Sequence, residues 1–388
     1  MKLIYHHRTQ AEDGQAVHIR SMIQALEEEG HGVREVALVS RSRAPMSQEA
    51  LHQGNPSGGL RSMLGLPNFA REIAEHLYSF PAKGRLVRAG REFQPAGIYE
   101  RYAFGNRAGL WAARSLGVPL LLEVNSPMVL ELSRTRGLCF PRWGQRVERE
   151  VFCGADRVLV VTQVLGENLI ELGVDPDRVV VTPNGVHLDL YDNPDREAAR
   201  VDLGLENVSG PVLGFVGWVR EWHRLDLVVD ALAKGGLKDA HLVIIGGGPA
   251  LEGLADQATD LGVSERVHLA GPRLHRSIPG LLSAFDLGLV PAINPYASPL
   301  KLHEYMAAGL PVIAPDQPNL REVLRHEREA LLFPPGDGAA FLAACQRLVA
   351  DSEMRADLGA AARQSILDQD LTWKGNVRRV ECALGELS

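Results

Sequence analysis

The feature that most limits the possible folds is an alternation of short apolar runs with helical patterns. Lys2–His7 has the composition of a strand, residues 15–29 form an amphipathic helical pattern that Gly30 ends, and Val33–Val39 is a second apolar run. Strand–turn–helix–strand units of this kind are typical of parallel α/β sheets. Val212–Val216 opens a second series of the same type. The pattern therefore predicts an α/β protein with two doubly wound sheets.

Length and local composition predict two domains. A chain of 388 residues is long enough for two or three domains, each with its own core. Residues 187–210 are rich in Asp, Asn and Gly, as is typical of a connection between domains. We place the first domain at residues 1–190 and the second at residues 191–370.

Composition and charge exclude several classes of protein. Apolar residues make up 45% and charged residues 23% of the chain, as in soluble globular proteins. The net charge of −7 argues against a general nucleic-acid-binding protein. The four cysteines are scattered without Cys-x-x-Cys spacing, so neither a disulfide framework nor a zinc site is predicted. No run approaches the ~18 apolar residues of a membrane span, and we expect a cytoplasmic location.

The segment 291–322 carries the strongest signals for a ligand site. Ser298 is a suitable N-cap, Pro299 suits the first helical position, and Gly309 followed by Pro311 ends a helix. These signals predict a short helix from about Pro299 to Ala308, followed by a buried strand.

The start of this predicted helix is a candidate anion site. The N–H groups of Leu300 and Lys301 are free of helical partners there, and the helix dipole favours negative charge. The dipole disfavours the charge of Lys301 in the first turn, and a bound anion would explain its placement. Lys301 and Glu304 are three residues apart and share a face. The alternative interpretation is a solvated Lys–Glu pair on a surface helix.

Residues 304–314, Glu-Tyr-Met-Ala-Ala-Gly-Leu-Pro-Val-Ile-Ala, resemble the nucleotide-sugar signature of GT-B glycosyltransferases of the retaining family 4. The resemblance implies two facing Rossmann-like domains with a cleft between them and a C-terminal helix, within 371–388, that crosses back to the first domain. It also implies that Glu304 binds the ribose and that the helix start, with Ser298 and Pro299, holds the diphosphate. The family usually has a second Glu eight residues before the first, and Tyr296 stands there in this chain.

The turn after Val212–Val216 also resembles the family. In the family this turn has a Gly, an Arg directly after that Gly and a Lys six residues after the same Gly. The Arg and the Lys both bind the diphosphate. After Gly217 these positions are occupied by Trp218 and His223, and Arg220 lies between them. The resemblance therefore assigns Arg220 and His223 to the diphosphate, while a helix cap or a buried His is the alternative for His223.

Three further positions come from the resemblance. Gly14, in the turn after the first strand, would allow close approach of a ligand to the backbone. Asn125 follows the strand Pro119–Val124, where many family members have a His that touches the donor sugar; capping of the next helix is the alternative. Arg273 lies where the family backbone borders the nucleotide base.

Gly246-Gly-Gly-Pro249 invites a competing interpretation as a dinucleotide-binding loop. The fingerprint Gly-x-Gly-x-x-Gly needs a third Gly for close helix–strand packing, and Leu251 stands at that position. We therefore predict a tight turn and no flavin or nicotinamide cofactor.

Two segments are basic in an otherwise acidic chain. Lys83–Arg91 holds four basic residues, and Arg134–Arg149 holds five, with Phe140 and Trp143 among them. Such segments favour an anionic membrane surface or a lipid-diphosphate acceptor. Solvated helix faces are the alternative.

Together these features predict a glycosyltransferase that moves a sugar from a UDP- or GDP-sugar to a sugar or lipid-linked acceptor hydroxyl, in cell-surface polysaccharide or glycolipid synthesis. Asn125, Arg220, Lys301 and Glu304 are the candidate catalytic residues. No metal-ligand cluster is evident among them, so we expect metal-independent chemistry and no cofactor. Peripheral contact with the inner face of the membrane is expected, and nucleic acid is not. A nucleotide-sugar epimerase and a non-catalytic nucleotide-sugar-binding subunit are the alternatives.

Overall fold

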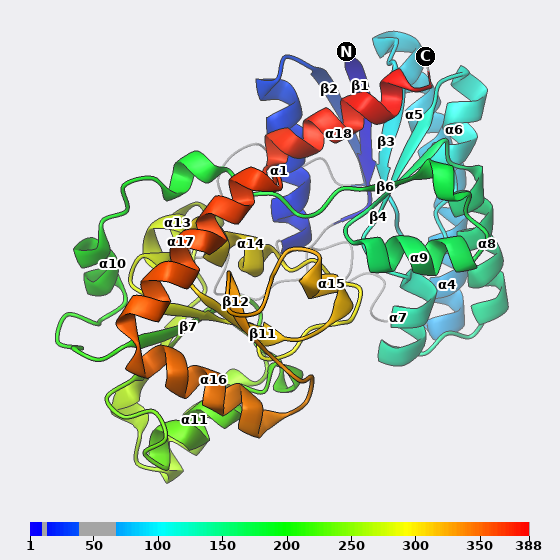
Figure 1. Cartoon of the computed structure of the whole chain (residues 1–388). Coiled ribbons are helices and arrows are strands. Elements are labelled where there is room, and N and C mark those ends of the chain that lie inside the picture. The colour runs from blue at the N-terminus through cyan, green and yellow to red at the C-terminus, as the bar shows by residue number, and fades with distance from the viewer. Residues whose placement is uncertain (10–13, 39–66, 388) are drawn as a thin grey trace. The chain divides into compact units, whose positions relative to one another are not determined.

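The computed structural model describes residues 1–9, 14–38 and 67–387 of the chain. These residues form two compact units (Figure 1). Unit 1 holds the described residues up to Pro183 and those from Trp373 onward, and unit 2 holds Asn184–Thr372. The domain limits given above from the sequence stay a prediction.

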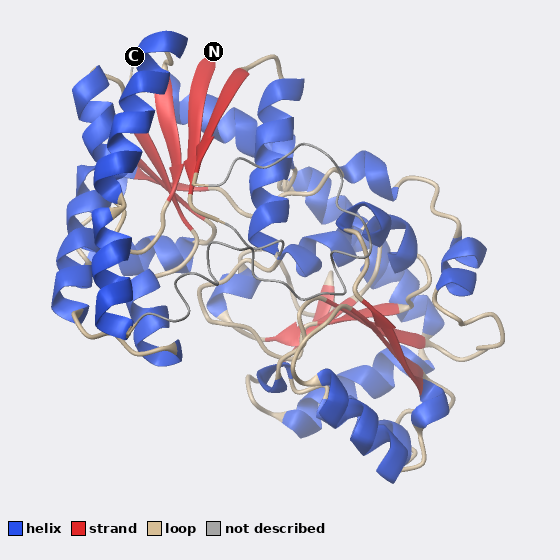
Figure 2. Cartoon of the chain, turned by 180° about the vertical axis from the view of Figure 1, so that it is seen from behind, coloured by secondary structure: helices blue, strands red, loops and turns tan. Residues whose placement is uncertain are grey.

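A six-stranded sheet forms the centre of unit 1, in the order β2-β1-β3-β4-β5-β6, and all its neighbouring pairs are parallel. Its central strands are almost wholly buried because helices cover both faces, and besides apolar residues they bury Glu100, Arg101 and Glu123 (Figure 2). The strands are β1 (Lys2–His7), β2 (Gly32–Ala37), β3 (Gly97–Arg101), β4 (Leu120–Val124), β5 (Arg157–Val160) and β6 (Val179–Val181).

The first helix shows why the sequence folds this way locally. It buries Ile19, Met22 and Leu26, which recur every three or four residues. Gly30 follows it with a φ of 81°, a left-handed conformation that a glycine adopts at low cost. The helices described in unit 1 are α1 (Gly14–Glu28), α4 (Asn68–Leu77), α5 (Ser79–Phe93), α6 (Ala108–Leu116), α7 (Met128–Thr135), α8 (Pro141–Gly154), α9 (Gln163–Glu171) and α18 (Trp373–Gly385).

The last helix, α18, packs in unit 1 against α1. The Trp373 ring meets the His18 ring edge-on at 4.9 Å between centroids, and the Asn376 side chain donates a 2.6 Å hydrogen bond to the Pro183 carbonyl. The chain therefore returns at its C-terminus to the first unit, as the resemblance implied.

Unit 2 also has a six-stranded parallel sheet, in the order β12-β11-β10-β7-β8-β9. Successive residues of β7 belong to two different cores: Val212 and Val216 to one, Leu213 and Phe215 to the other. Because side chains alternate across a strand, the two cores lie on opposite faces of the sheet. The strands are β7 (Val212–Val216), β8 (His241–Ile245), β9 (Val267–Gly271), β10 (Leu287–Leu289), β11 (Val312–Pro315) and β12 (Ala330–Phe333).

Helices flank both faces of this second sheet (Figures 1 and 2). They are α10 (Arg196–Asp202), α11 (Asp226–Ala233), α12 (Leu251–Asp260), α13 (Ile278–Leu282), α14 (Leu300–Ala307), α15 (Pro318–Arg321), α16 (Gly338–Ala350) and α17 (Ser352–Asp368). The prediction of two doubly wound parallel sheets is confirmed. Strand β12 was not predicted.

Candidate functional site

The order of strands in unit 2 marks one edge of its sheet as a ligand site. Strands β7 and β10 are neighbours, yet β8 lies on the far side of β7 and β11 on the far side of β10. In open α/β sheets ligands bind outside the carboxyl ends of the strands at such a switch point. The turn that begins at Gly217 follows β7, and the segment that leads into α14 follows β10. The two segments predicted to bind the donor therefore meet at this edge.

Lys301 connects the two segments. A Cβ placed on Gly217 would lie 3.3 Å from the Lys301 Nζ, so the ammonium sits directly against the turn. Nζ also lies 3.7 Å from the centroid of the Phe215 ring, within range of a cation–π contact. Burial lowers the pKa of Lys301 to about 7, although the charge of Glu304 acts in the opposite direction. A cation held between a backbone turn and an aromatic ring is suited to an incoming anion.

His223 stands beside this lysine as a neutral ring. It is buried, its ring meets Phe215 edge-on, and its Nδ1 accepts a 3.1 Å hydrogen bond from the Arg220 N–H. Burial, and then the charges of Lys301 and Arg220, lower the pKa of His223 to about 3. Because Nδ1 accepts, the proton of the neutral ring is on Nε2, which is then a donor. The side chain of Arg220 itself is exposed.

Glu304 is held in place by a partner that the sequence did not suggest. Its side chain is buried, and His275 Nε2 lies 2.7 Å from Glu304 Oε1. The alternative of a solvated Lys301–Glu304 pair is therefore wrong for Glu304, which is buried and pairs with His275 from the segment after β9. The signal for His275 was its place two residues beyond Arg273, in the segment predicted to border the base.

The start of α14 differs from the prediction by one residue. The helix begins at Leu300, and Pro299 precedes it in an extended conformation with a φ of −77° and a ψ of 128°. The prediction of Ser298 as a side-chain cap is wrong, because Pro299 occupies the cap position. The Ser298 hydroxyl instead accepts a 3.4 Å hydrogen bond from the Asn184 N–H, and its carbonyl accepts one from the Asn184 side chain. Gly309 ends the helix with a φ of 69°, as predicted.

Arg273 and Tyr296 lie in the same unit and make local contacts. The Arg273 guanidinium donates to the Ala270 carbonyl and lies 3.8 Å from Asp202. Tyr296 is buried in the segment between β10 and α14. Their predicted contacts with a donor stay predictions.

The glycine-rich loop after β8 supports the turn after β7. A Cβ on Gly246 would lie 1.9 Å from the Gly217 carbonyl oxygen, and one on Gly248 would lie 2.1 Å from that of Val219. Hydrogen bonds join the two turns from the Gly217 N–H to Ile245 and from the Val219 N–H to Gly247. These glycines allow two stretches of backbone to touch. Their role in this unit is therefore structural, as a tight turn requires.

In unit 1, Asn125 extends a buried polar cluster at the carboxyl ends of β3 and β4. Its side-chain amide donates to Glu123, which also receives hydrogen bonds from Arg101 and, at 2.7 Å, from the Tyr99 hydroxyl. The His18 Nε2 lies 3.0 Å from the same carboxylate. Although burial raises the pKa of Glu123, the charges of His18 and Arg101 hold it well below its usual range. Asn125 does not cap α7, because Pro127 occupies that cap position.

The described residues offer neither a membrane span nor a metal site. Within residues 1–9, 14–38 and 67–387, no helix is both long and apolar enough to span a membrane. In the same ranges, no three His, Cys, Asp or Glu side chains gather as ligands for a metal ion. Gly14 is the first residue of α1, and most of the turn predicted before it, residues 10–13, lies outside the described residues.

Comparison with known families identifies the chain. A family model described as "Glycosyl transferases group 1" matches residues 210–351, and one described as "Glycosyltransferase Family 4" matches residues 13–190. The chain belongs to these glycosyltransferases.

The glycosyltransferase is similar to relatives of known name and to solved structures. It is 29% identical over 334 residues to a D-inositol 3-phosphate glycosyltransferase of Acidothermus cellulolyticus, a match that covers 81% of this chain and 73% of that relative. Other relatives of that name match over less than two thirds of their length. Anabaena Alr3699/HepE, solved in complex with UDP, is 19% identical with a TM-score of 0.73, and both chains are covered in full. Sucrose-phosphate synthase from Thermosynechococcus elongatus is 20% identical with a TM-score of 0.75, covering 100% of this chain and 99% of that one. These likenesses show that the glycosyltransferase has the GT-B fold.

Proposed function

We propose that this glycosyltransferase transfers a sugar from a nucleoside diphosphate sugar, and that unit 2 binds the nucleoside diphosphate at the carboxyl ends of β7 and β10. The observation that carries the proposal is the position of Lys301. Its ammonium lies against the Gly217 turn and in the first turn of α14, so the N–H groups at the helix start and one cation surround the same place. An anion there would meet the positive end of the helix as well.

The chemistry needs a stabilised leaving group. Transfer breaks the bond between the anomeric carbon and the diphosphate oxygen and forms one to the acceptor oxygen, while the acceptor hydroxyl loses its proton. Negative charge develops on the departing diphosphate, and fixed donors aimed at that charge lower the barrier. Lys301, the N–H groups at the start of α14, His223 Nε2 and the exposed cation of Arg220 supply such donors. Because the pKa of Lys301 is about 7 in the empty site, we expect the arriving diphosphate to raise it and to hold the lysine charged.

Glu304 would position the donor through the ribose hydroxyls. His275 contacts only Oε1 of Glu304, so Oε2 is free of that contact and can accept from a hydroxyl. Alr3699/HepE has been solved with UDP and with UDP-glucose, which supports a UDP-sugar as donor. The acceptor would be a sugar, a cyclitol phosphate or a lipid-linked hydroxyl compound of the cell surface.

We expect the transfer to keep the anomeric configuration of the donor, as in the retaining family that the chain resembles. We also expect it to proceed in EDTA, because the cations named above act on the diphosphate in place of a metal. The test is proton NMR of the product formed from a panel of UDP- and GDP-hexoses with inositol phosphate and simple sugar acceptors, with an excess of EDTA present. An anomeric coupling of the opposite configuration, or activity that returns only with a divalent ion, would contradict the expectation. A sugar nucleotide altered without acceptor would indicate an epimerase, and binding without any turnover would indicate a non-catalytic subunit.

A further inference from the structure

Helix α4 of unit 1 has its polar side inward and its apolar side outward. The residues it buries are Glu72, Glu75 and His76. Apart from Asn68 at its start, the side chains that it exposes are apolar, and Phe80 in the next helix continues them. The exposed fractions are 50% for Phe69, 36% for Ile73, 52% for Leu77 and 63% for Phe80. We call these four residues the apolar stripe.

The apolar stripe lies on one continuous helical face. Its members are spaced by four, four and three residues, which places neighbours one turn apart. Tyr78, the residue between α4 and α5, is itself in the right-handed helical conformation with a φ of −52° and a ψ of −30°. The spacing therefore carries over from one helix to the next.

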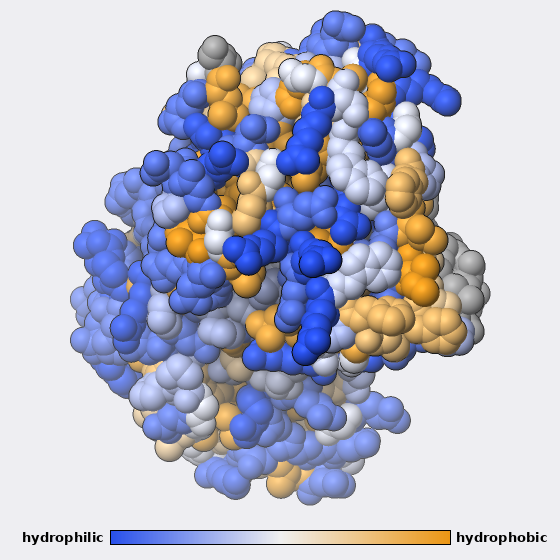
Figure 3. Space-filling model, turned by 90° about the vertical axis from the view of Figure 1, so that its right-hand side faces the viewer, coloured by the Kyte–Doolittle hydropathy of each residue, from blue (hydrophilic) through white to orange (hydrophobic). Residues whose placement is uncertain are grey.

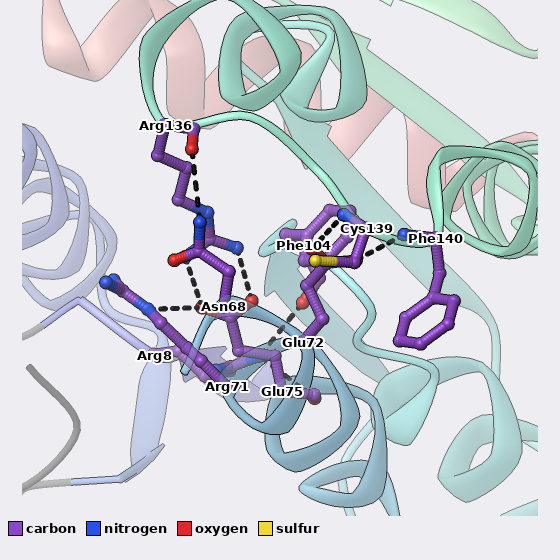
Figure 4. Close-up of polar contacts among 9 residues, drawn as sticks. All are labelled: Arg8, Asn68, Arg71, Glu72, Glu75, Phe104, Arg136, Cys139 and Phe140. Carbon is purple, nitrogen blue, oxygen red and sulfur yellow. Dashed lines mark hydrogen bonds and ion pairs between the residues drawn. The ribbon is translucent and has the colours of Figure 1, made fainter. Parts of the chain in front are cut away.

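The inward face of α4 is fixed by charged hydrogen bonds (Figure 4). The Glu72 carboxylate accepts from the backbone N–H groups of Cys139 and Phe140, the latter at 2.9 Å. The Glu75 carboxylate forms a bidentate pair with Arg136, at 3.0 and 2.6 Å. Turning the helix to bury its apolar side would break these contacts and leave the partners unpaired. The outward direction of the apolar stripe is thus built into the fold.

The charges around the apolar stripe are basic. Between Asn68 and Arg91 the chain has five basic and two acidic residues, and the two acidic ones are the inward Glu72 and Glu75. Arg85 and Arg88, on α5, are exposed. Figure 3 shows the side of the molecule on which α6 and α8 are labelled in Figure 1. Hydrophobic residues gather along the right-hand edge of that view, beside hydrophilic ones.

An aromatic pair extends the apolar stripe toward a neighbouring helix. The Phe80 ring lies 5.3 Å from that of Trp111 on α6, and the Arg107 guanidinium lies 5.8 Å from the centroid of the same Trp ring. Arg107 itself pairs with Glu150 at 2.9 Å, so the feature that fits a membrane here is Trp111, because Trp side chains are enriched at the level of lipid headgroups.

We propose that the apolar stripe inserts into the interfacial layer of an anionic membrane, with Arg85 and Arg88 at the headgroups. A helix with one apolar face and basic flanks lies in the plane of such an interface, held by burial of its apolar face and by attraction to anionic lipids. The inverted amphipathicity of α4 supports this occupant, since water alone would favour the opposite orientation of the helix. This proposal locates the membrane contact expected from the basic segment 83–91, and it does not depend on the proposed nucleotide chemistry.

The test is co-sedimentation of the full chain with vesicles of phosphatidylcholine alone or with about a third of phosphatidylglycerol. We expect the wild type to bind the mixed vesicles. The double variant Leu77→Glu, Phe80→Glu should bind them about tenfold or more weakly, because each of the two apolar side chains loses the area that it would bury in the membrane. The double variant Arg85→Gln, Arg88→Gln should bind mixed vesicles less well and should lose most of the preference for them. The matched control is Leu190→Glu, Val201→Glu, which places two charges at residues of unit 2 that are 51% and 60% exposed. It should bind like the wild type.

Circular dichroism checks that the variants are folded. Every substitution is at an exposed side chain, so we expect all of the variants to keep the fold. Equal binding of the wild type and the Leu77→Glu, Phe80→Glu variant would overturn the proposal. A wild type that stays in solution with both kinds of vesicle would overturn it too. If light scattering shows a wild-type dimer that this variant abolishes, and no vesicle binding, the occupant of the apolar stripe is a second copy of the chain and the membrane is excluded.

Discussion

Replacing Glu123 with Gln is expected to lower the free energy of unfolding by about 3–5 kcal/mol, the cost of removing one partner from a buried ion pair. Glu123 is 1% exposed, and its carboxylate interacts with the side chains of Arg101, His18 and Tyr99. The amide keeps the size of the side chain but removes the charge that compensates the buried guanidinium. Urea unfolding followed by circular dichroism measures the change.

Glu92→Gln is the matched control. Glu92 pairs with Arg34 at 2.7 Å, but its side chain is 54% exposed, and such pairs contribute about 0–1 kcal/mol. A change at Glu123 as small as that at Glu92 would show that the cluster in unit 1 contributes little.

The pH dependence of stability gives a second view of the same residue. Because the folded-state pKa of Glu123 lies below its usual range, the unfolded chain binds the proton more tightly. The contribution of Glu123 to the free energy of unfolding is therefore complete above about pH 5. It is lost as the pH falls through the usual carboxyl range toward the lower pKa of the folded state. Glu123→Gln should flatten this acid limb of the wild-type curve.

Replacing Lys301 with Met is expected to weaken nucleoside diphosphate binding by about 1–3 kcal/mol, the range of a charged hydrogen bond. The nucleoside without phosphates should bind both proteins alike, because Lys301 faces the turn that would hold the phosphates. Arg220→Ala should show the same selectivity. The double variant should lose less than the sum of the two if both cations act on one phosphate. Isothermal titration calorimetry measures each affinity.

The same substitution should not destabilise the empty protein. The pKa of Lys301 is lowered to about 7 in the folded state, while the unfolded chain keeps a value of about 10.4. Between these values the unfolded state binds more protons, so wild-type stability rises with pH from about 7 to about 10. Lys301→Met removes this dependence and the cost of the buried charge at lower pH, although it also loses the contact of Nζ with Phe215.

Lys234→Met serves as the control for Lys301. Lys234 is 73% exposed, lies in the same unit and pairs with Asp230 on the surface. Its replacement should leave both affinities unchanged. If Lys301→Met weakens the nucleoside and the diphosphate to the same extent, the lysine is not a phosphate ligand.

The sequence predicted those parts of the protein that local signals specify. Apolar runs bounded by turn residues located most strands, because a strand buried on both faces is mostly apolar. Gly309 was predicted correctly as the end of α14, since its left-handed conformation is one that other residues rarely adopt. The start of the same helix was misplaced by one residue, because both Ser298 and Pro299 suit a helix start and only the extended backbone of Pro299 decides between them.

The contacts that the sequence did not predict join residues far apart in the chain. The pair of His275 with Glu304 links the segment after β9 to α14, and periodicity carries no information about such a pair. The cluster around Glu123 draws on α1, β3 and β4, so its members have no common motif. The orientation of helix α4 was not predicted either, because it depends on Arg136 and on backbone N–H groups that follow α7.

Calorimetric titration shows directly whether Glu304 and the surrounding edge of unit 2 form a nucleotide site. UDP and GDP, and the corresponding nucleosides, are titrated into the wild type and into Glu304→Ala and Glu304→Gln. We expect the wild type to bind at least one of the two diphosphates. Glu304→Ala should weaken that binding, and Glu304→Gln, which keeps an acceptor oxygen, should weaken it less. If the wild type bound neither diphosphate at millimolar concentration, or if Glu304→Ala bound with equal affinity, unit 2 would not have the nucleotide site that we propose.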